Sequence, residues 1–374
     1  MTEIDWVGID WMDRAVAQTQ GLYPYVPGKP VEQLLREKGL SHAVKLASNE
    51  NAYGPSPKAM LAMQEAVSEV HRYPDGDCTE LKSALAARHD VKTNQIIIGN
   101  GSNEVLELLI RCFAGAGDEV VYSQCGFIVY ALATQAAGAM QVAVPDTADL
   151  GHDLQAMAAA VSDKTKVVCI ANPNNPTGTL LNNDELQSFL DALPRQIVVI
   201  LDEAYDEFVS DIKEDSLCVL KHPGLVVSRT FSKAYGLAGC RVGYAIADAD
   251  LLNAVNRFRE PFNVNNFAQV AALAALDDGE WVMDKVAKVK VERARLEAAL
   301  DDLGVLGGQS YANFVLLKHA KAGDILNRLE DQGIIPRPLA GYGLKDYLRV
   351  SVGTAEENDV FLQGLNVVLK QVKA

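Results

Sequence analysis

A lysine that directly follows an apolar strand is the strongest chemical signal in this sequence. The run Leu225–Ser228 predicts a buried strand, and the segment RTFSK that follows it ends at Lys233. Burial among small residues lowers the pKa of the ammonium group and makes the lysine a nucleophile. Thr230, Ser232 and Arg241 are near in sequence and suited to hold a dianionic phosphate. A solvated surface lysine is the alternative interpretation.

Polar residues also end two other predicted strands. Ile197–Leu201 runs into Asp202, and a carboxylate that ends a buried strand is costly unless it faces a cation or a metal. Its neighbour Glu203 must point to the opposite side of an extended chain, so only one of the two can face a given ligand. An N-cap for the next helix is the alternative for Asp202. Val167–Ala171 leads into NPNNPTG (172–178), which either presents asparagine side chains or makes a rigid turn.

A glycine-rich turn precedes another expected helix. The strand Ile96–Ile98 is followed by GNGSNE (99–104), and the free N–H groups and dipole of a helix N-terminus favour anions. A phosphate cradle is one interpretation, and a helix capped by Ser102 or Asn103 is another. A dinucleotide-binding turn is disfavoured because Glu104 stands where its third glycine belongs, although acidic residues follow at a suitable spacing.

Together these strand ends supply what a phosphate-bearing aldehyde cofactor needs. They offer a lysine for a Schiff base, a carboxylate for a pyridine nitrogen, donors for a ring oxygen and a phosphate cradle. A protonated pyridine ring absorbs the electrons of a carbanion. Because the carboxyl ends of parallel strands form one ligand-binding edge, the groups are expected to meet there. The sequence therefore predicts pyridoxal 5′-phosphate as the cofactor, and no metal.

The elements that must position these groups alternate between short β-branched runs and helix-period stretches, from about residue 50 to residue 265. Helices are expected over Glu104–Phe113 and Asp184–Leu193, and a further strand over Glu119–Tyr122. Such alternation is typical of an α/β fold with a mostly parallel sheet covered on both faces. Strands near Phe314–Leu317 and Tyr347–Ser351 belong to a smaller α+β segment.

Three parts of the chain are expected. Residues 1–45 form an N-terminal arm and part of a small domain, with an extended Pro- and Gly-rich piece at 21–30. Residues 46–265 form the large cofactor-binding domain. Residues 266–374 form a linking helix, in the tract Phe267–Leu303, and the small C-terminal domain.

Composition narrows the class of protein. The chain has 374 residues, 49% of them hydrophobic, and a formal charge of −15, which argues against a general nucleic-acid or anionic-membrane binder. Its six cysteines include no CxxC pair, which favours a reducing compartment. The acidic N-terminus is unlike a signal peptide, and no apolar run is long enough to span a membrane. A cytoplasmic protein is expected.

On these motifs the sequence resembles the fold-type I pyridoxal-phosphate aminotransferases, and within them the histidinol-phosphate aminotransferases. NPNNPTG, DEAY and TFSKAYGLAGCRVGY in combination are highly specific for the superfamily, and the resemblance runs from Tyr23-Pro-Tyr25 to Arg349-Val-Ser-Val-Gly353. It implies a large domain with a mostly parallel, seven-stranded-type sheet flanked by helices, a smaller C-terminal α+β domain and an N-terminal arm.

The resemblance also implies a role for each matching residue. Lys233 would hold the cofactor and shuttle a proton between the substrate Cα and the cofactor C4′, and Asp202 would face the pyridinium nitrogen. The other implied cofactor contacts are Asn175 and Tyr205 at the ring oxygen, Phe127 stacked on the ring, Ser102, Asn103, Thr230, Ser232 and Arg241 at the phosphate, and Tyr73 reaching the neighbouring subunit's cofactor phosphate. The implied substrate contacts are Arg349 at the α-carboxylate, Asn51 beneath the substrate, and Tyr25 and Arg337 at a substrate phosphate.

Two positions depart from the family pattern. SQCG (123–126) precedes Phe127 where the family more often has prolines followed by Ser or Thr, and Ala52 stands where proline is common. Neither position removes a catalytic group, and both touch the rim of the substrate and cofactor site.

The implied activity is a homodimeric aminotransferase. It would move the amino group of L-histidinol phosphate to 2-oxoglutarate by a ping-pong route, giving imidazole-acetol phosphate and L-glutamate. An aromatic amino acid aminotransferase is the first alternative, because Arg337 can also stack on a ring. A fold-type I lyase or decarboxylase is a lesser one, against which Arg349 argues. A nicotinamide oxidoreductase conflicts with Glu104, and a cofactor-sensing regulator would need a DNA-binding domain that the short acidic arm cannot hold.

Overall fold

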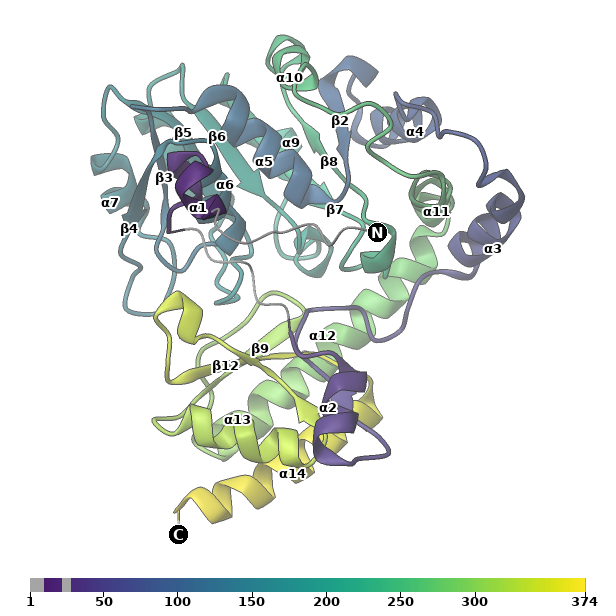
Figure 1. Cartoon of the computed structure of the whole chain (residues 1–374), viewed down its shortest axis with the longest axis vertical. Coiled ribbons are helices and arrows are strands. Elements are labelled where there is room, and N and C mark those ends of the chain that lie inside the picture. The colour runs from purple at the N-terminus through teal and green to yellow at the C-terminus, as the bar shows by residue number, and fades with distance from the viewer. Residues whose placement is uncertain (1–9, 22–27, 374) are drawn as a thin grey trace, which may run out of the picture.

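The computed structural model describes residues 10–21 and 28–373. A seven-stranded sheet forms the centre of the larger part of the molecule (Figure 1). In spatial order its strands are β2 (Ile96–Gly99), β8 (Gly243–Ile246), β7 (Leu225–Thr230), β6 (Val198–Asp202), β5 (Thr165–Ala171), β3 (Glu119–Ser123) and β4 (Met140–Val144). All pair in parallel except β8, which is antiparallel to both of its neighbours. The predicted α/β class with a mostly parallel sheet is confirmed.

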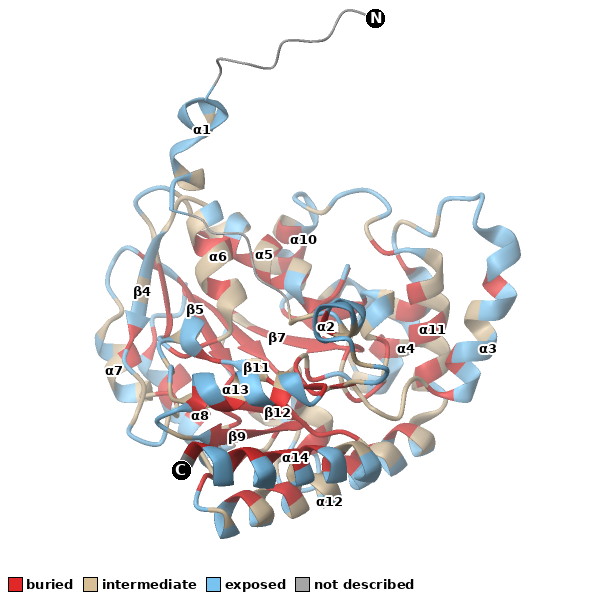
Figure 2. Cartoon of the chain, turned by 60° about the horizontal axis from the view of Figure 1, so that its bottom comes forward, coloured by how far each residue is buried: buried red, intermediate tan, exposed pale blue. Residues whose placement is uncertain are grey.

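Helices cover both faces of this sheet because the strands are apolar on both sides. On β5, Cys169 belongs to the core beneath one set of helices, and its neighbours Val168 and Ile170 belong to the core beneath the other set. The first set is α5 (Ser102–Phe113), α6 (Ile128–Ala136) and α10 (Ala249–Asn256). The second set is α7 (Leu154–Ala159), α8 (Asn183–Ala192) and α9 (Ser216–Val219). Figure 2 shows most of the strands as buried, the edge strand β4 as largely exposed, and the outward helix faces as exposed.

A smaller sheet lies in the C-terminal part of the chain. Its strand order is β11 (Arg337–Pro338), β12 (Tyr347–Ser351) and β9 (Phe314–Lys318), all antiparallel. The helices α13 (Ala322–Asp331) and α14 (Ala355–Lys373) accompany it in the lower part of Figure 1.

Two helices connect the larger part of the molecule to the smaller one. They are α11 (Asn266–Leu276) and α12 (Gly279–Asp302), and α12 runs toward the smaller sheet in Figure 1. The sequence predicted one helical tract over Phe267–Leu303, which was wrong in one respect. The chain leaves the helix at Asp277 and Asp278, and α12 starts afresh at Gly279.

The N-terminal segment attaches to the C-terminal part. Helix α2 (Val31–Lys38) follows Lys29, whose Nζ lies 2.6 Å from a carboxylate oxygen of Glu330. Strand β1 (Val44–Lys45) pairs in parallel with β10 (Ile334–Ile335). Before this segment lie α1 (Trp11–Arg14) and η1 (Ala17–Thr19). Much of the expected extended piece at 21–30 lies outside the described residues.

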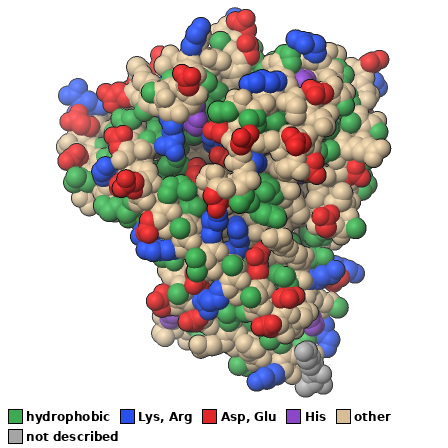
Figure 3. All heavy atoms as spheres, turned by 180° about the vertical axis from the view of Figure 1, so that it is seen from behind, with side chains coloured by type: hydrophobic (Ala, Val, Ile, Leu, Met, Phe, Trp, Pro, Cys, Tyr) green, Lys and Arg blue, Asp and Glu red, His purple; other side chains and the backbone are tan. Residues whose placement is uncertain are grey.

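The remaining helices lie at the edges of the large sheet and in its loops. They are α3 (Pro57–Ala66), η2 (Val67–Glu69), α4 (Thr79–His89), η3 (Thr93–Gln95), η4 (Asp206–Phe208) and η5 (Ala238–Cys240). A further short helix, η6 (Ala340–Tyr342), connects β11 and β12 of the smaller sheet. Among residues 10–21 and 28–373, no helix is long and apolar enough to cross a membrane. Figure 3 shows acidic and basic side chains interspersed over one face of the molecule.

Candidate active site

A cavity of about 270 Å³ lies where the strands of the large sheet end. Ala171, Asp202 and Thr230, the last residues of β5, β6 and β7, all line it. Most of the predicted site residues are brought together here, as the strand-end argument requires. They are Ser102, Asn103, Phe127, Asn175, Asp202, Tyr205, Thr230, Ser232, Lys233, Arg241, Arg337 and Arg349.

Lys233 follows β7 and enters this cavity as a weakened base. Burial, followed by the charge of Arg349, lowers the pKa of Lys233 to about 8. Its Nζ donates to the backbone oxygen of Ser48 at 3.2 Å and lies 5.9 Å from the centre of the Tyr205 ring. Roughly a tenth of the amine is therefore unprotonated near neutral pH, far more than for an ordinary lysine, and this is the form that attacks a carbonyl carbon.

Asp202 ends β6 and is buried against the cavity. Tyr130 Oη donates to its Oδ2 at 3.0 Å, while Oδ1 has no hydrogen-bond partner within residues 10–21 and 28–373. Burial raises the pKa of Asp202 to about 6, so the group is mainly a carboxylate at neutral pH. A buried carboxylate oxygen of this kind fits a charged N–H donor such as a protonated pyridine nitrogen. The alternative of an N-cap was wrong, since Tyr205 occupies that position of η4.

Glu203 points away from the cavity, as the alternation of an extended chain predicted. Arg229 donates to its Oε2 through Nε at 3.1 Å and Nη2 at 2.7 Å. Lys213 and the hydroxyl of Ser216 contact the other carboxylate oxygen, at 3.0 and 2.6 Å. Asp215 accepts a further bond from Arg229 at 2.6 Å. This buried ionic cluster links the ends of β6 and β7 on the side away from the cavity. Glu203 is the residue after Asp202, and Arg229 is the residue before Thr230.

Replacing Arg229 with methionine is expected to lower the free energy of unfolding by about 3–5 kcal/mol, because it leaves buried carboxylates without their main cation. The control is Arg111→Met, which removes a surface pair with Glu107. We expect Arg111→Met to lower the free energy of unfolding by less than about 1 kcal/mol. Denaturant unfolding of both variants at one protein concentration measures the difference. Equal small losses would show that the cluster does not stabilise the strand ends.

The N-terminus of α5 forms the opposite wall of the cavity. Its N-cap is Gly101, with φ of 80° and no side-chain cap bond in the described structure, so the alternative of capping by Ser102 or Asn103 was wrong. A Cβ at Gly101 would collide with the guanidinium of Arg241. Arg241 thus lies against exposed helix N–H groups, an arrangement that favours a phosphate.

Glu104 has a structural role in the same turn. Its Oε2 accepts the backbone N–H of Asn100 and the amide of Asn263, each at 2.6 Å. The carboxylate thus satisfies local donors, which agrees with the departure from a dinucleotide-binding motif.

Of the side chains expected at the ring oxygen, Asn175 contacts Arg349, the residue predicted to hold the substrate α-carboxylate. Arg349 Nη1 donates to Asn175 Oδ1 at 2.5 Å, and Nη2 donates to the backbone oxygen of Ala47 at 2.9 Å. Tyr205 Oη accepts from Asn49 Nδ2 at 2.8 Å. Phe127 precedes α6 and meets Tyr130 edge-on, with ring centroids 6.0 Å apart.

Two predicted site residues, Tyr73 and Asn51, do not line the cavity in the described structure. Tyr73 is 83% exposed and stacks on Phe262, with centroids 4.7 Å apart. Asn51 instead donates through Nδ2 to the backbone oxygen of Ala234 at 2.8 Å, which braces the residue after Lys233. Tyr25 lies outside the described residues.

Sequence reasoning missed other contributors. Asn49 and Glu50 line the cavity, and they precede the predicted Asn51 in the run SNEN (48–51). This polar run is the signal from which they could have been predicted. Tyr342 lines the cavity from η6, and Tyr130 contacts Asp202 from inside α6. No local pattern marked either tyrosine.

Comparison with known proteins adds independent findings. The family model of aminotransferase class I and II matches residues 41–365. A histidinol-phosphate aminotransferase of Methylobacillus flagellatus is 47% identical over 362 residues, covering 96% of this chain and 98% of the relative. Histidinol-phosphate aminotransferase 2 of Pseudomonas aeruginosa is 48% identical over 365 residues, with 96% and 99% coverage. The crystal structure of histidinol-phosphate aminotransferase from Sinorhizobium meliloti, in complex with pyridoxal-5′-phosphate, gives a TM-score of 0.87 at 30% identity, with 96% and 98% coverage.

Proposed function

The chain belongs to the class I and II aminotransferases, and from that premise we propose that it is a histidinol-phosphate aminotransferase. It transfers the amino group between L-histidinol phosphate and 2-oxoglutarate and serves histidine biosynthesis. The near-full-length relatives of that name, at 47% and 48% identity, support the assignment.

The cofactor proposed for the cavity is pyridoxal 5′-phosphate. The unpaired Oδ1 of Asp202 fits its ring nitrogen, and the Arg241 guanidinium at the N-terminus of α5 fits its phosphate. When bound, this cofactor withdraws the electron pair left on the substrate carbon. Lys233 holds the cofactor through its amine and then carries the proton between the substrate Cα and the cofactor C4′. Asp202 holds the proton on the ring nitrogen.

The observation that carries the substrate assignment is a pair of arginines. Arg337 on β11 and Arg349 on β12 are direct partners in the antiparallel register, so both side chains leave the same face of the sheet. Both line the cavity. Two guanidiniums suit the two charges of a phosphate monoester, whereas the single carboxylate of an aromatic amino acid needs one. Histidinol phosphate carries such a group, and Arg349 is the proposed clamp for the α-carboxylate of glutamate.

Replacing Arg337 with leucine tests this assignment. We expect kcat/KM for histidinol phosphate to fall about 10- to 100-fold, the value of one or two charged hydrogen bonds. We expect kcat/KM for phenylalanine to change less than about threefold, because that substrate has no phosphate. The matched control is Arg328→Leu on α13, where the guanidinium bonds Gln371 at the surface. A similar loss for both substrates would instead support the aromatic aminotransferase.

The assembly proposed is a homodimer. Its support is the exposed side chain of Tyr73, stacked on the exposed Phe262, together with the exposed Val67 and Val70 that precede Tyr73 in the chain. Tyr73 would then reach the partner's cofactor phosphate. Tyr25 keeps its proposed place at the substrate, whereas the bond from Asn51 to Ala234 supports a place for Asn51 behind Lys233 instead.

The proposed domain division is an arm over 1–45, a cofactor domain over 46–265 and a C-terminal domain over 266–374. The separate seven- and three-stranded sheets support it. The proposed compartment is the cytoplasm, which the six free cysteines support.

A further inference from the structure

Asn49 occupies a buried, constrained position at the cavity. It lies between β1 and α3, lines the cavity and is 1% exposed. Its φ of 54° is left-handed, a conformation that Asn and Asp adopt more readily than other residues with side chains. The Asn313 amide donates to its backbone oxygen at 2.9 Å. The backbone conformation and this contact fix the position of the Asn49 side chain.

The direction of each hydrogen bond around the Asn49 carboxamide follows from its partners. The backbone N–H of Asn49 donates to Ser351 Oγ at 2.8 Å, and the Ser351 hydroxyl donates to Asn49 Oδ1 at 3.2 Å. The carboxamide oxygen therefore faces Ser351, and Nδ2 faces Tyr205 Oη at 2.8 Å. An amide nitrogen only donates, so the Tyr205 oxygen accepts this bond. The proton of Tyr205 must point to another acceptor.

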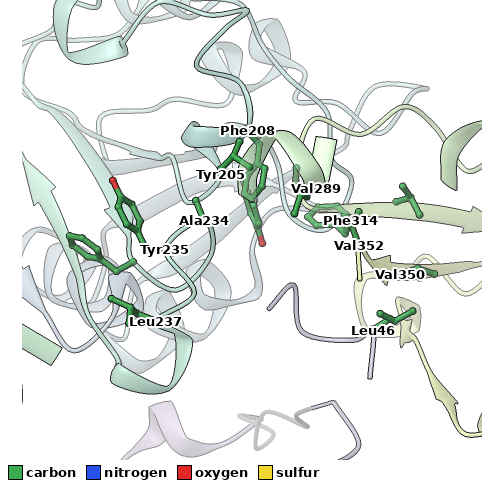
Figure 4. Close-up of a cluster of buried hydrophobic side chains, with 14 of the residues drawn as sticks. Leu46, Tyr205, Phe208, Ala234, Tyr235, Leu237, Val289, Phe314, Val350 and Val352 are labelled. Atoms are coloured by element: carbon green, nitrogen blue, oxygen red, sulfur yellow. The ribbon is translucent and has the colours of Figure 1, made fainter. Parts of the chain in front are cut away.

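Tyr205 is held so that this proton is available at the cavity. Its ring meets Phe314 edge-on, with centroids 5.5 Å apart. Figure 4 shows the hydroxyl pointing away from Phe208 and out of the hydrophobic cluster. Burial raises the pKa of Tyr205 to about 12, so the hydroxyl keeps its proton at neutral pH.

We propose that Asn49 is a positioning residue that makes Tyr205 a hydrogen-bond donor to the ring oxygen of the cofactor. The inference rests on the proposed function. Asn49 acts through Tyr205, and Ser351 sets the orientation of Asn49. Arg349 and Ser351 are two residues apart on β12 and leave the same face of the strand. One strand face therefore both clamps the substrate and fixes the donor at the cofactor.

The variant Asn49→Asp tests this direction of donation. A carboxylate accepts only, so Tyr205 would turn its proton toward Asp and away from the cofactor. A hydrogen-bond donor stabilises negative charge on the ring oxygen of the cofactor. This negative charge is greatest in the deprotonated form that the pH titration produces, so the donor favours that form. Losing the donor should therefore raise the midpoint of the pH titration of the near-visible absorbance by about one unit or more. Circular dichroism of the holoenzyme checks that the variant is folded.

The added negative charge of the aspartate could raise the midpoint by itself, so a double-mutant cycle with Tyr205→Phe is needed. We expect Tyr205→Phe to raise the midpoint, and Asn49→Asp to add little in that background. A full additional rise in the Tyr205→Phe background would mean that charge alone acts, and would overturn the inference.

Ser351→Ala provides a variant that introduces no charge. It frees the carboxamide to rotate, and we expect a smaller rise in the same direction. No shift in Tyr205→Phe, or none in either Asn49→Asp or Ser351→Ala, would also overturn the inference while leaving the proposed reaction in place. A wild-type holoenzyme with no near-visible band would instead contradict the proposed function.

Discussion

Replacing Lys233 with alanine is expected to abolish transamination and leave the fold intact. The amine is buried in the cavity with its pKa lowered to about 8, and alanine offers neither a nucleophile nor a proton carrier. Removing such a group from an enzyme that depends on it lowers kcat by about 10⁴-fold or more. The measurement is kcat with histidinol phosphate and 2-oxoglutarate, together with the near-visible absorbance, which should also be lost.

Two further variants test whether the loss of activity is specific to the amine of Lys233. Lys164→Ala removes an exposed lysine and is expected to retain full activity. Lys233→Arg keeps a positive charge but no titratable amine, so it should be as inactive as the alanine variant. Near-normal transamination by either Lys233 variant would contradict the role assigned to this residue.

Replacing Asp202 with asparagine is expected to have the second largest effect. Asparagine has the same shape, but it must present its oxygen to Tyr130 and its amide to the ring nitrogen, so it disfavours a proton on that nitrogen. Loss of a buried charged pair of this kind corresponds to about 3–5 kcal/mol, or roughly 10²- to 10⁴-fold in kcat. Because the Asp202 carboxylate also attracts the protonated ring nitrogen, we expect the Asp202→Asn variant to bind the cofactor more weakly than the wild type.

The control for Asp202→Asn is Asp184→Asn, an exposed carboxylate in the first turn of α8. It should leave both kcat and the cofactor dissociation constant unchanged. If Asp202→Asn kept kcat within about threefold of the wild type, the ring nitrogen would not depend on this carboxylate.

The cofactor-site residues that local patterns indicated share one property, which is that they lie at or just beyond the end of a strand. Lys233, Asp202 and Asn175 follow β7, β6 and β5, so the parallel topology alone brings them to one edge. The strand ranges were predictable because short apolar runs flanked by polar residues mark buried strands. The prediction for β12, Tyr347–Ser351, matched its observed bounds.

The parts that sequence did not predict depend on contacts distant along the chain. Tyr130 and Asp202 are 72 residues apart, and Asn49 and Tyr205 are 156 apart, so no local spacing indicates either hydrogen bond. Strand β8 was not predicted, and neither was its antiparallel course, because an apolar run carries no sign of strand direction. The alignment of Arg337 with Arg349 depends on the register of two strands, which the structure supplies.

The most direct measurement is a half-reaction titration of the holoenzyme. Histidinol phosphate, phenylalanine, tyrosine or aspartate is mixed with the enzyme without an amino acceptor, and the loss of the near-visible band is followed. We expect histidinol phosphate to bleach the band far faster than phenylalanine, because only the former presents a phosphate to Arg337 and Arg349. Equal or faster bleaching by phenylalanine would contradict the assignment and favour an aromatic aminotransferase. Absence of any band to bleach would contradict the cofactor itself.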